Sequence, residues 1–415
     1  MLHFRYHLSI VLLLFSTLPI VLSQSPTDTA TLSNGVEFPL RGIGVGNLAH
    51  EDIGRIVRTA ASDSSLLLID TAHASRNEHI IEQALVGSTT SAHVVTKVWY
   101  TYLGYHRTQF SVNASLLALS PSVQHVHMLL HWPRCRDDIP WMDCAGEEAQ
   151  LDASVRDGLD DPPPHLHKDT AFLASWEALE DMYQSTDRLA SIGVSNFDVK
   201  DLKMLLAEAK VVPHLIQLNV WSVLFDTPLV QLCKDKKIQI QVYNVFGILN
   251  SHQKAPNAYH SLETIASSLS IPTVTQLVLD WLVTWHGVSI IPRTSRVEHV
   301  RSNTAAAAAS VVDWQPETTA AITAATQALL RGVDLVPPHA VFASRHDEDV
   351  HVFWKQSNDG EEDALIPVKE NLRPGDVFAT NTHPGHVFVA VSGERRKEFT
   401  ITAGYGDQEE IHIEL

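Results

Sequence analysis

Three side chains able to do acid–base chemistry lie at the ends of three apolar runs. Asp70 closes "SLLLID", Lys97 lies in "HVVTKVW" and His131 follows "HMLL". Reduction of a carbonyl needs a proton donor for the developing alkoxide, tuned by a nearby ammonium and carboxylate. A lysine at the end of an apolar strand is costly unless it is paired, and Asp70 is its natural partner. The same residues could instead form an ion pair at the rim of the fold without chemistry, and the sequence leaves that alternative open.

These side chains can meet only if their strands end at the same edge of the fold. Short apolar runs alternate with amphipathic helical segments, and their continuous apolar character is typical of parallel strands covered on both faces. Eight such units over about 250 residues predict an α/β fold, a (β/α)8 TIM barrel, whose active sites lie at the strand C-termini. A doubly wound sheet is the rival, but no G-x-G-x-x-G follows the first run. The eight expected strands are 40–46, 65–72, 93–99, 125–133, 189–196, 214–220, 238–247 and 288–295.

Two further segments lie outside the regular alternation. A polar, proline-rich insertion at 134–168 is expected as a long loop above the face where the strands end. Residues 341–415 alternate apolar and polar side chains at period two, broken by "NDG" and "RPGD" turns, which predicts a small antiparallel β-sandwich. The expected domains are therefore a barrel at 24–335 and a β domain at 341–415.

Several short patterns predict the secretory pathway. Residues 1–23 carry a charged start and an apolar core typical of a signal peptide, with a membrane anchor as the alternative. Asn113 begins a glycosylation sequon, and Cys135 and Cys144 could form a local disulfide in an oxidising lumen. The final "HIEL" resembles an ER-retrieval tetrapeptide. We expect a glycoprotein of the ER lumen, or a secreted one.

Composition limits the partners. Apolar residues make up 45% of the chain and charged residues 19%, as in a globular protein. The formal net charge is −18, and no cluster of Lys and Arg suits a nucleic-acid backbone. Neither the cysteines nor the "HPGH" histidine pair offers a complete ligand set, so no metal site is expected. The expected partner is a small carbonyl or alcohol substrate, and the protein is expected to be a monomer.

Residues 30–335 resemble the aldo-keto reductase family. The resemblance rests on "LSNGVEFPLRGIGVG", "IDTAHASRNE", "VVTKVW", "LLHWP", "SIGVSNF", "IQLNV", "QVYNVFG" and "IIPRTSRVEHVRSN", in the family's order. It implies a catalytic Asp, Tyr, Lys and His, of which Asp70, Lys97 and His131 are present. Ser75 stands in the tyrosine position, and its hydroxyl is shorter and far less acidic than a phenol. His131, or a water held by Ser75, is then the candidate proton donor, and Tyr100, Tyr102 and Tyr105 follow close behind Lys97.

The same resemblance implies NADP(H) as the cofactor. Amide and hydroxyl side chains match the positions that hold the nicotinamide carboxamide, and an aromatic residue matches the one that stacks on its ring. A cation with two hydroxyls matches the site of the adenosine 2′-phosphate, where a histidine replaces a common arginine. The implied cofactor residues are Ser195, Asn196, Gln217, Tyr243, Arg293, Thr294, Ser295, His299 and Asn303.

The C-terminal segment resembles a second family, the β domain of the von Hippel–Lindau protein. The resemblance rests on "DVHVFWKQSNDGEEDALIPVKENLRPGDVFATNTHPGHVFVAV", with its "DG" turn, "L-x-P-G" turn and "T-x-x-G-H-x-F" pattern. It implies a peptide pocket at Thr382, His386 and Phe388, although the segment could equally be a stabilising appendage. Two functions follow: an NADP(H)-dependent carbonyl reductase of weak or altered activity, or a non-catalytic nucleotide- or protein-binding derivative.

Overall fold

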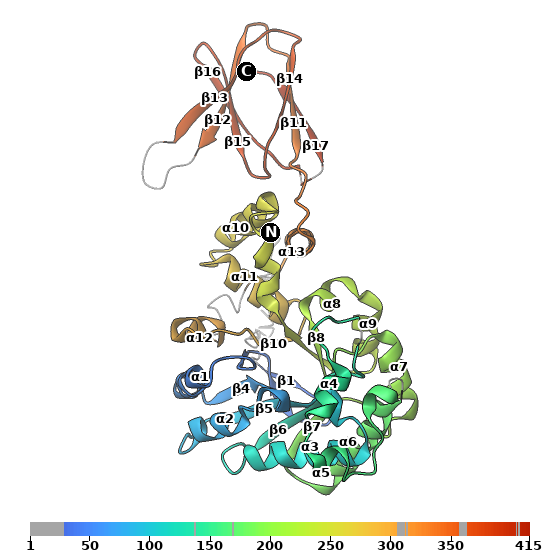
Figure 1. Cartoon of the computed structure of the whole chain (residues 1–415). Helices are drawn as coiled ribbons and strands as arrows, with labels where there is room; N and C mark the ends of the chain where they lie inside the picture. The colour runs from blue at the N-terminus through green and yellow to red at the C-terminus, as the bar shows by residue number, and fades with distance from the viewer. Residues whose placement is uncertain are drawn as a thin grey trace, which may run out of the picture.

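The computed structural model describes residues 29–136, 138–167, 170–304, 312, 314–356, 363–403, 405 and 407–415. The expected signal segment at 1–23 lies outside these residues. Figure 1 shows two units, an α/β barrel and a separate β domain joined to it after helix α13 (Pro316–Arg331). None of the helices within these ranges has the length and apolar character needed to cross a bilayer.

Eight parallel strands form the barrel, in the order β10-β9-β8-β7-β6-β5-β4-β3. Isolated bridges from Arg41 to Ile290 and from Gly44 to Arg293 bring its two edge strands together. The predicted (β/α)8 fold is confirmed, although the last strand is shorter than predicted because Pro292 carries no N–H for the ladder. The strands are β3 (Gly42–Gly44), β4 (Leu66–Asp70), β5 (Ser91–Val98), β6 (His125–Leu130), β7 (Leu189–Ser195), β8 (Leu215–Asn219), β9 (Gln239–Tyr243) and β10 (Ser289–Ile290).

Helices cover the outside of the barrel (Figure 1). Each presents an apolar stripe to the strands; α1, for example, buries Ile53, Ile56, Val57 and Ala60, spaced three or four residues apart. The covering helices besides α13 are α1 (His50–Asp63), α2 (Glu78–Leu85), α3 (Tyr105–Ala118), α6 (Ala171–Ser185), α7 (Val199–Glu208), α8 (Val220–Phe225), α9 (Thr227–Asp235), α10 (Pro256–Ser268), α11 (Val274–Thr284) and α12 (Val297–Thr304). This continuous core holds the strands in register and so fixes where their C-termini meet.

A hairpin that the sequence did not reveal precedes the barrel. Strands β1 (Thr29–Thr31) and β2 (Glu37–Pro39) pair in an antiparallel manner, and Phe38 is fully buried. Phe38 packs with interior barrel residues such as Leu68 and Val95 and meets the His127 ring edge-on at 4.9 Å. The hairpin therefore completes the packing of the barrel interior.

The insertion at 134–168 is more ordered than the expected loop. It contains α4 (Cys144–Ala149), α5 (Ala153–Arg156) and a short 3-10 turn at Pro164–Leu166. A disulfide joins Cys135 to Cys144. The fully buried Arg107 of α3 pairs with Glu148 at 2.9 Å and donates to the Thr101 carbonyl at 3.1 Å. The disulfide closes a short loop within the insertion, and the buried Arg107–Glu148 pair fastens the insertion to the barrel.

The C-terminal unit is a sandwich of two sheets, ordered β14-β11-β17 and β13-β12-β15-β16. Its pairs are antiparallel as predicted, except that β11 and β17 run parallel. Between the sheets lies an apolar core that includes Phe342, Val352, Phe388 and Ile411. The strands are β11 (His339–Ser344), β12 (Val350–Gln356), β13 (Ala364–Leu372), β14 (Val377–Asn381), β15 (Val387–Ser392), β16 (Arg395–Thr400) and β17 (Gln408–Ile413).

Candidate active site

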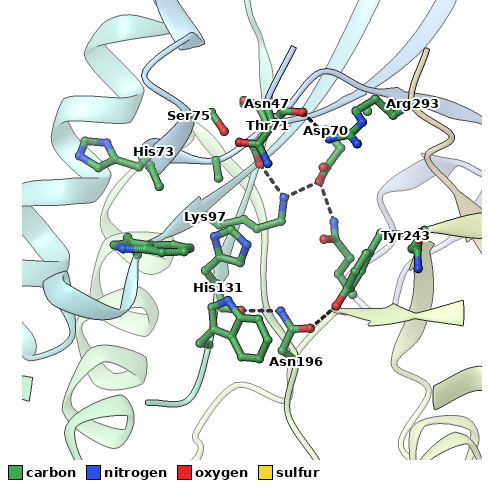
Figure 2. A pocket seen from close by; sticks show the side chains of 18 of the residues that line it. Asn47, Asp70, Thr71, His73, Ser75, Lys97, His131, Asn196, Tyr243 and Arg293 are labelled. Carbon is green, nitrogen blue, oxygen red and sulfur yellow. Dashed lines mark hydrogen bonds and ion pairs between the residues drawn. The ribbon is translucent and has the colours of Figure 1, made fainter. Parts of the chain in front are cut away.

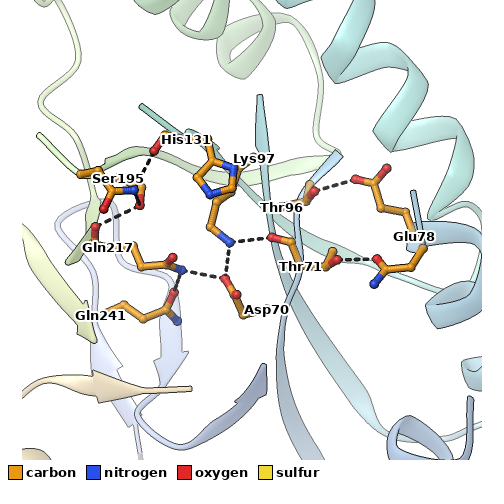
Figure 3. Close-up of polar contacts among 11 residues, drawn as sticks. Asp70, Thr71, Glu78, Thr96, Lys97, His131, Ser195, Gln217 and Gln241 are labelled. Atoms are coloured by element: carbon orange, nitrogen blue, oxygen red, sulfur yellow. Dashed lines mark hydrogen bonds and ion pairs between the residues drawn. The ribbon is translucent and has the colours of Figure 1, made fainter. Parts of the chain in front are cut away.

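Asp70 and Lys97 form a buried ion pair at the mouth of the barrel. Asp70 is the last residue of β4, and Lys97 is the next-to-last of β5. The Lys97 Nζ lies 2.6 Å from Asp70 Oδ1 and donates to the Thr71 carbonyl at 2.6 Å (Figure 3). Only 3% of Lys97 is exposed, so its ammonium is held almost entirely by protein oxygens. The structure thus brings together the first two residues singled out from the sequence.

His131 lies directly after β6 and faces the same mouth (Figure 2). Burial, and then the charge of Lys97, lowers the pKa of His131 well below its ordinary value. The imidazole is therefore neutral at physiological pH and can donate one proton without carrying charge. Its Nδ1 has no hydrogen-bond partner in the described structure, and the ring meets Trp99 edge-on at 4.8 Å.

Ser75 ends a 3-10 turn (His73–Ser75) and lines the cavity above Lys97. The residues that follow hold the turn in place. The buried Asn77 accepts a hydrogen bond from Thr71 and donates to the Val45 carbonyl at 3.2 Å. Glu78 accepts from Thr96 Oγ1 at 2.6 Å. The framework around the expected tyrosine position is therefore intact, while its side chain ends in a short hydroxyl.

The residues expected to hold the nicotinamide form a linked group beside the ion pair. Tyr243 donates to Asn196 Oδ1 at 2.7 Å, and Asn196 Nδ2 donates to the His131 carbonyl at 3.0 Å (Figure 2). Gln217 Nε2 donates to Asp70 Oδ1 and to Gln241 Oε1, at 2.6 and 2.7 Å (Figure 3). Sequence reasoning missed Gln241, whose position inside an apolar strand gave no sign of its role.

Ser195 differs from its neighbours in this group. It is fully buried, and its hydroxyl donates to the Gln217 carbonyl at 3.0 Å. It also accepts a hydrogen bond from Asn196 Nδ2 at 3.1 Å. Asn196, Gln217 and Tyr243 line the cavity, whereas Ser195 supports them from behind.

The residues expected to bind the phosphate and adenine lie between β10 and the end of α12. Arg293 lines the cavity, and Thr294 and Ser295 follow it just before the helix begins. His299 is exposed in the first turns of α12, where it could reach an anion at this end of the helix. Asn303 is 3% exposed, and its Nδ2 has no partner in the described structure. A cation, hydroxyls and an unpartnered buried amide fit a nucleotide that supplies the missing acceptors.

The three tyrosines after Lys97 have different environments. Tyr100 is buried, and Tyr105 is on the surface, donating to Asp181 at 2.7 Å. Of the three, Tyr102 lines the cavity, with its ring edge-on to His73 at 5.1 Å. Burial raises the pKa of Tyr102, which makes it a weaker acid than an exposed phenol. Tyr102 is thus the one of these three tyrosines that shares the cavity with Ser75 and Lys97.

The cavity itself has a volume of about 1240 Å³ and extends from Arg293 past Lys97 to the insertion. Its wall on the insertion side is largely aromatic. This wall is formed by Trp99, Tyr102, Trp132, Ile139, Trp141, Glu147 and Leu151. Sequence reasoning did not identify it, although an isolated tryptophan three residues before Cys144 in a polar segment was a usable signal.

The remaining candidate residues lie away from the barrel mouth. Asn113 is exposed on α3. In the β domain, Thr382 Oγ1 lies 3.2 Å from His386 Nδ1, and His386 packs against Trp354 with ring centroids 5.0 Å apart. Phe388 is 3% exposed and packs against Phe342 in the sandwich core. It is paired in register with Trp354, which packs against the same core, so Phe388 is a core residue beneath this group and not an exposed member of it. The described ranges contain no cluster of three His, Cys, Asp or Glu arranged for a metal.

Curated relatives share the barrel. The chain is 25% identical over 310 residues to glycerol 2-dehydrogenase (NADP(+)) of Saccharomyces cerevisiae, covering 69% of this chain and 88% of the relative. It is 29% identical over 284 residues to glyoxal reductase of Bacillus subtilis, covering 66% and 86%. These relatives reduce or oxidise different compounds, so they point to a type of chemistry rather than to one substrate.

Solved structures and a family model agree with this. An aldo-keto reductase from a Medee basin deep-sea metagenome library matches with a TM-score of 0.55 and 23% identity, covering 72% of this chain and 94% of that one. The Bombyx mori aldo-keto reductase in complex with NADP matches with a TM-score of 0.54 and 20% identity, covering 72% and 92%. The model of the aldo/keto reductase family matches residues 42–324, more than half of the chain. With its barrel, its strand-end residues and this match together, the chain belongs to the aldo/keto reductase family.

Proposed function

We propose that the protein is an NADP(H)-dependent oxidoreductase that reduces a carbonyl to an alcohol, with an altered proton donor. The observation that carries this is the buried Asp70–Lys97 pair beside a neutral His131 in one cavity. An ion pair that only stabilised the rim of the barrel would not need a neutral imidazole beside it. Nor would it need a group of side chains suited to hold a nicotinamide carboxamide. The alternative is a non-catalytic nucleotide-binding derivative, which the same cofactor residues would also serve.

The cofactor, when bound, supplies the hydride. Tyr243 and Asn196 offer an aromatic face and an amide at one end of the cavity, and Arg293 offers a cation at the other. Gln217 connects the residues proposed to hold the nicotinamide with the Asp70–Lys97 pair, since its amide donates to Asp70. These side chains would orient the nicotinamide towards Lys97 and His131.

The proton has two candidate sources among the residues of this chain. His131 is neutral and can donate from one ring nitrogen to a substrate oxygen. Ser75 can hold a water in the space that a phenol would occupy, beside the Lys97 ammonium. Lys97, held by Asp70 and Thr71, stabilises negative charge on the oxygen in either case.

NADPH titration and aldehyde-dependent NADPH oxidation test this function. We expect wild-type protein to bind NADPH and to oxidise it slowly when an aldehyde is present. Lys97→Met should lower kcat/KM by about 10²-fold or more, because it removes a positioned charge, while NADPH still binds. Lys203→Met, an exposed lysine on α7, is the matched control and should change neither. Activity that survives Lys97→Met unchanged would contradict the proposed reductase.

A second function is proposed for the β domain, which we suggest recognises a proline- or hydroxyproline-bearing peptide. The supporting observation is the contact of Trp354, Thr382 and His386, an aromatic face next to two polar groups. We expect saturable binding of such a peptide to the full chain and its loss in His386→Ala. Arg395→Ala, exposed on β16, should bind normally. A wild-type chain that binds neither peptide would overturn this proposal.

We also propose that the protein works in the secretory pathway. The disulfide between Cys135 and Cys144 and the exposed Asn113 support an oxidising lumen.

A further inference from the structure

We infer that the cavity selects carbonyl compounds whose far end is an alkylated ammonium group, through the indole rings and the Glu147 carboxylate of its outer wall. This rests on the proposed function, since the carbonyl itself would lie at Lys97 and His131. The inference concerns the opposite end of the substrate, which contacts the wall built partly by the insertion.

Three tryptophans from three different segments meet in this wall. Trp99 follows β5, Trp132 follows β6, and Trp141 belongs to the insertion. The ring of Trp141 lies 6.2 Å from that of Trp99 at an interplanar angle of 25°, and 5.9 Å from that of Trp132 at 65°. Trp141 remains 57% exposed although it is a large apolar side chain. Indole faces attract cations, and more strongly where the cation is partly desolvated.

Glu147 adds a negative charge to the same wall. Its Oε2 accepts a hydrogen bond from Trp99 Nε1 at 2.7 Å, so the carboxylate fixes the indole and lies beside it. No Lys or Arg in the described part of the chain forms an ion pair with it, unlike the neighbouring Glu148, which Arg107 neutralises. Burial, and then interaction with Glu147 and Asp143, raises the pKa of Tyr100.

Among the described residues, three Lys or Arg side chains line the cavity. Lys97 is neutralised by Asp70, and Arg293 lies beyond Lys97, at the end assigned to the cofactor phosphate (Figure 2). Arg76 is exposed to solvent, and its charge reaches Tyr102 at one side of the wall, whereas the Glu147 carboxylate is bonded to Trp99. A wall of indoles with one unpaired carboxylate therefore favours a cationic group over a neutral group of the same shape, which would gain only apolar contact.

An isosteric pair of alcohols tests recognition without chemistry. Choline and 3,3-dimethylbutan-1-ol have the same shape and differ in charge, and their binding to the full chain with NADP+ can be followed by calorimetry. We expect choline to bind about ten-fold more tightly. Glu147→Gln should remove most of this preference, and Asp157→Asn, an exposed carboxylate of the same insertion, should keep it. Trp141→Leu is a second, independent variant. It should also reduce the preference for choline over 3,3-dimethylbutan-1-ol, without altering the Trp99–Glu147 hydrogen bond.

The corresponding aldehydes separate this inference from the proposed function. Trimethylammonioacetaldehyde should be reduced with a higher kcat/KM than 3,3-dimethylbutanal, in wild type and in Ser75→Tyr. Equal affinity for the two alcohols, or a preference unchanged in both Glu147→Gln and Trp141→Leu, would overturn the inference even if both aldehydes react. A choline preference that depends on Glu147, without oxidation of NADPH by either aldehyde, would support the recognition and contradict the reductase.

Discussion

At the scale of single residues, Ser75 sets the rate of the proposed chemistry. Asp70, Lys97 and His131 keep the contacts that a carbonyl-reducing site needs, and Asn77 and Glu78 still hold the turn that carries position 75. On the proposed function, charge stabilisation would be retained and proton donation would be weaker. Because charge stabilisation and proton donation lower the activation barrier separately, a site that keeps the first and weakens the second can still reduce a carbonyl, at a lower rate.

Ser75→Tyr should restore the missing donor. We expect kcat/KM for an aldehyde to rise by about 10²- to 10⁴-fold, which is the usual contribution of a positioned general acid. NADPH affinity should stay the same, because the substitution lies on the substrate side of Lys97. Ser75→Ala is the informative partner: it lowers the wild-type rate only if a Ser75-bound water supplies the proton, and leaves the rate unchanged if His131 does. No gain in Ser75→Tyr would mean that the phenol is not what limits turnover.

At the scale of elements, the amino-terminal half of the barrel interior contains an unusual set of histidines. His93 Nδ1 on β5 lies 3.0 Å from His127 Nε2 on β6, and His127 Nδ1 lies 2.7 Å from Ser191 Oγ on β7. His93 also stacks on His125 with centroids 4.5 Å apart. Burial, followed by the neighbouring imidazoles, lowers the pKa of His93 to about 4 and that of His127 well below its ordinary value. Both rings are thus neutral in the folded barrel.

Because of these histidines, we expect the free energy of unfolding to fall in mild acid. Below about pH 6.5 the unfolded chain takes up protons that the folded barrel does not, so stability is complete above this pH and falls towards pH 4. Each such histidine contributes a slope of about 1.4 kcal/mol per pH unit in that window. His127→Gln should flatten the fall of Tm between pH 6.5 and 4, whereas His106→Gln, exposed on α3, should not. Identical slopes in wild type and His127→Gln would show that the histidines do not set the acid response.

The strand ends and the place of the insertion could be predicted from sequence, but the internal structure of the insertion could not. Continuous apolar runs locate buried strands, and a side chain directly after such a run must reach the mouth of a parallel barrel, as Asp70 and Lys97 do. The position of the wall around Trp141 depends instead on tertiary contacts such as the Arg107–Glu148 pair, whose residues are 41 positions apart, whereas the Cys135–Cys144 bond spans nine residues and was anticipated from the sequence. No local pattern encodes the Arg107–Glu148 contact. The burial of Phe388 likewise depends on Phe342 of the facing sheet, which is distant in sequence.

At the scale of the whole molecule, the β domain rests on the helix α10 side of the barrel (Figure 1). The Tyr405 hydroxyl donates to the Asn257 carbonyl at 3.1 Å, and the rings of His260 and His383 lie 5.0 Å apart. His383 also touches His386, the residue proposed to recognise a peptide. A peptide bound there would lie close to this contact between the two units, and far in sequence from the residues that would bind NADPH.

The disulfide between Cys135 and Cys144 makes the wall around Trp141 a product of the cell compartment in which the chain folds. In a reducing cytosol those thiols would not be bonded to each other, although Cys135 would still belong to the barrel core and Cys144 would still pack against it. On the proposed function, we expect material prepared in such a host to bind NADPH as before and to differ in its preference among substrates. The choice of expression host is thus itself a determinant of the specificity that an assay would measure.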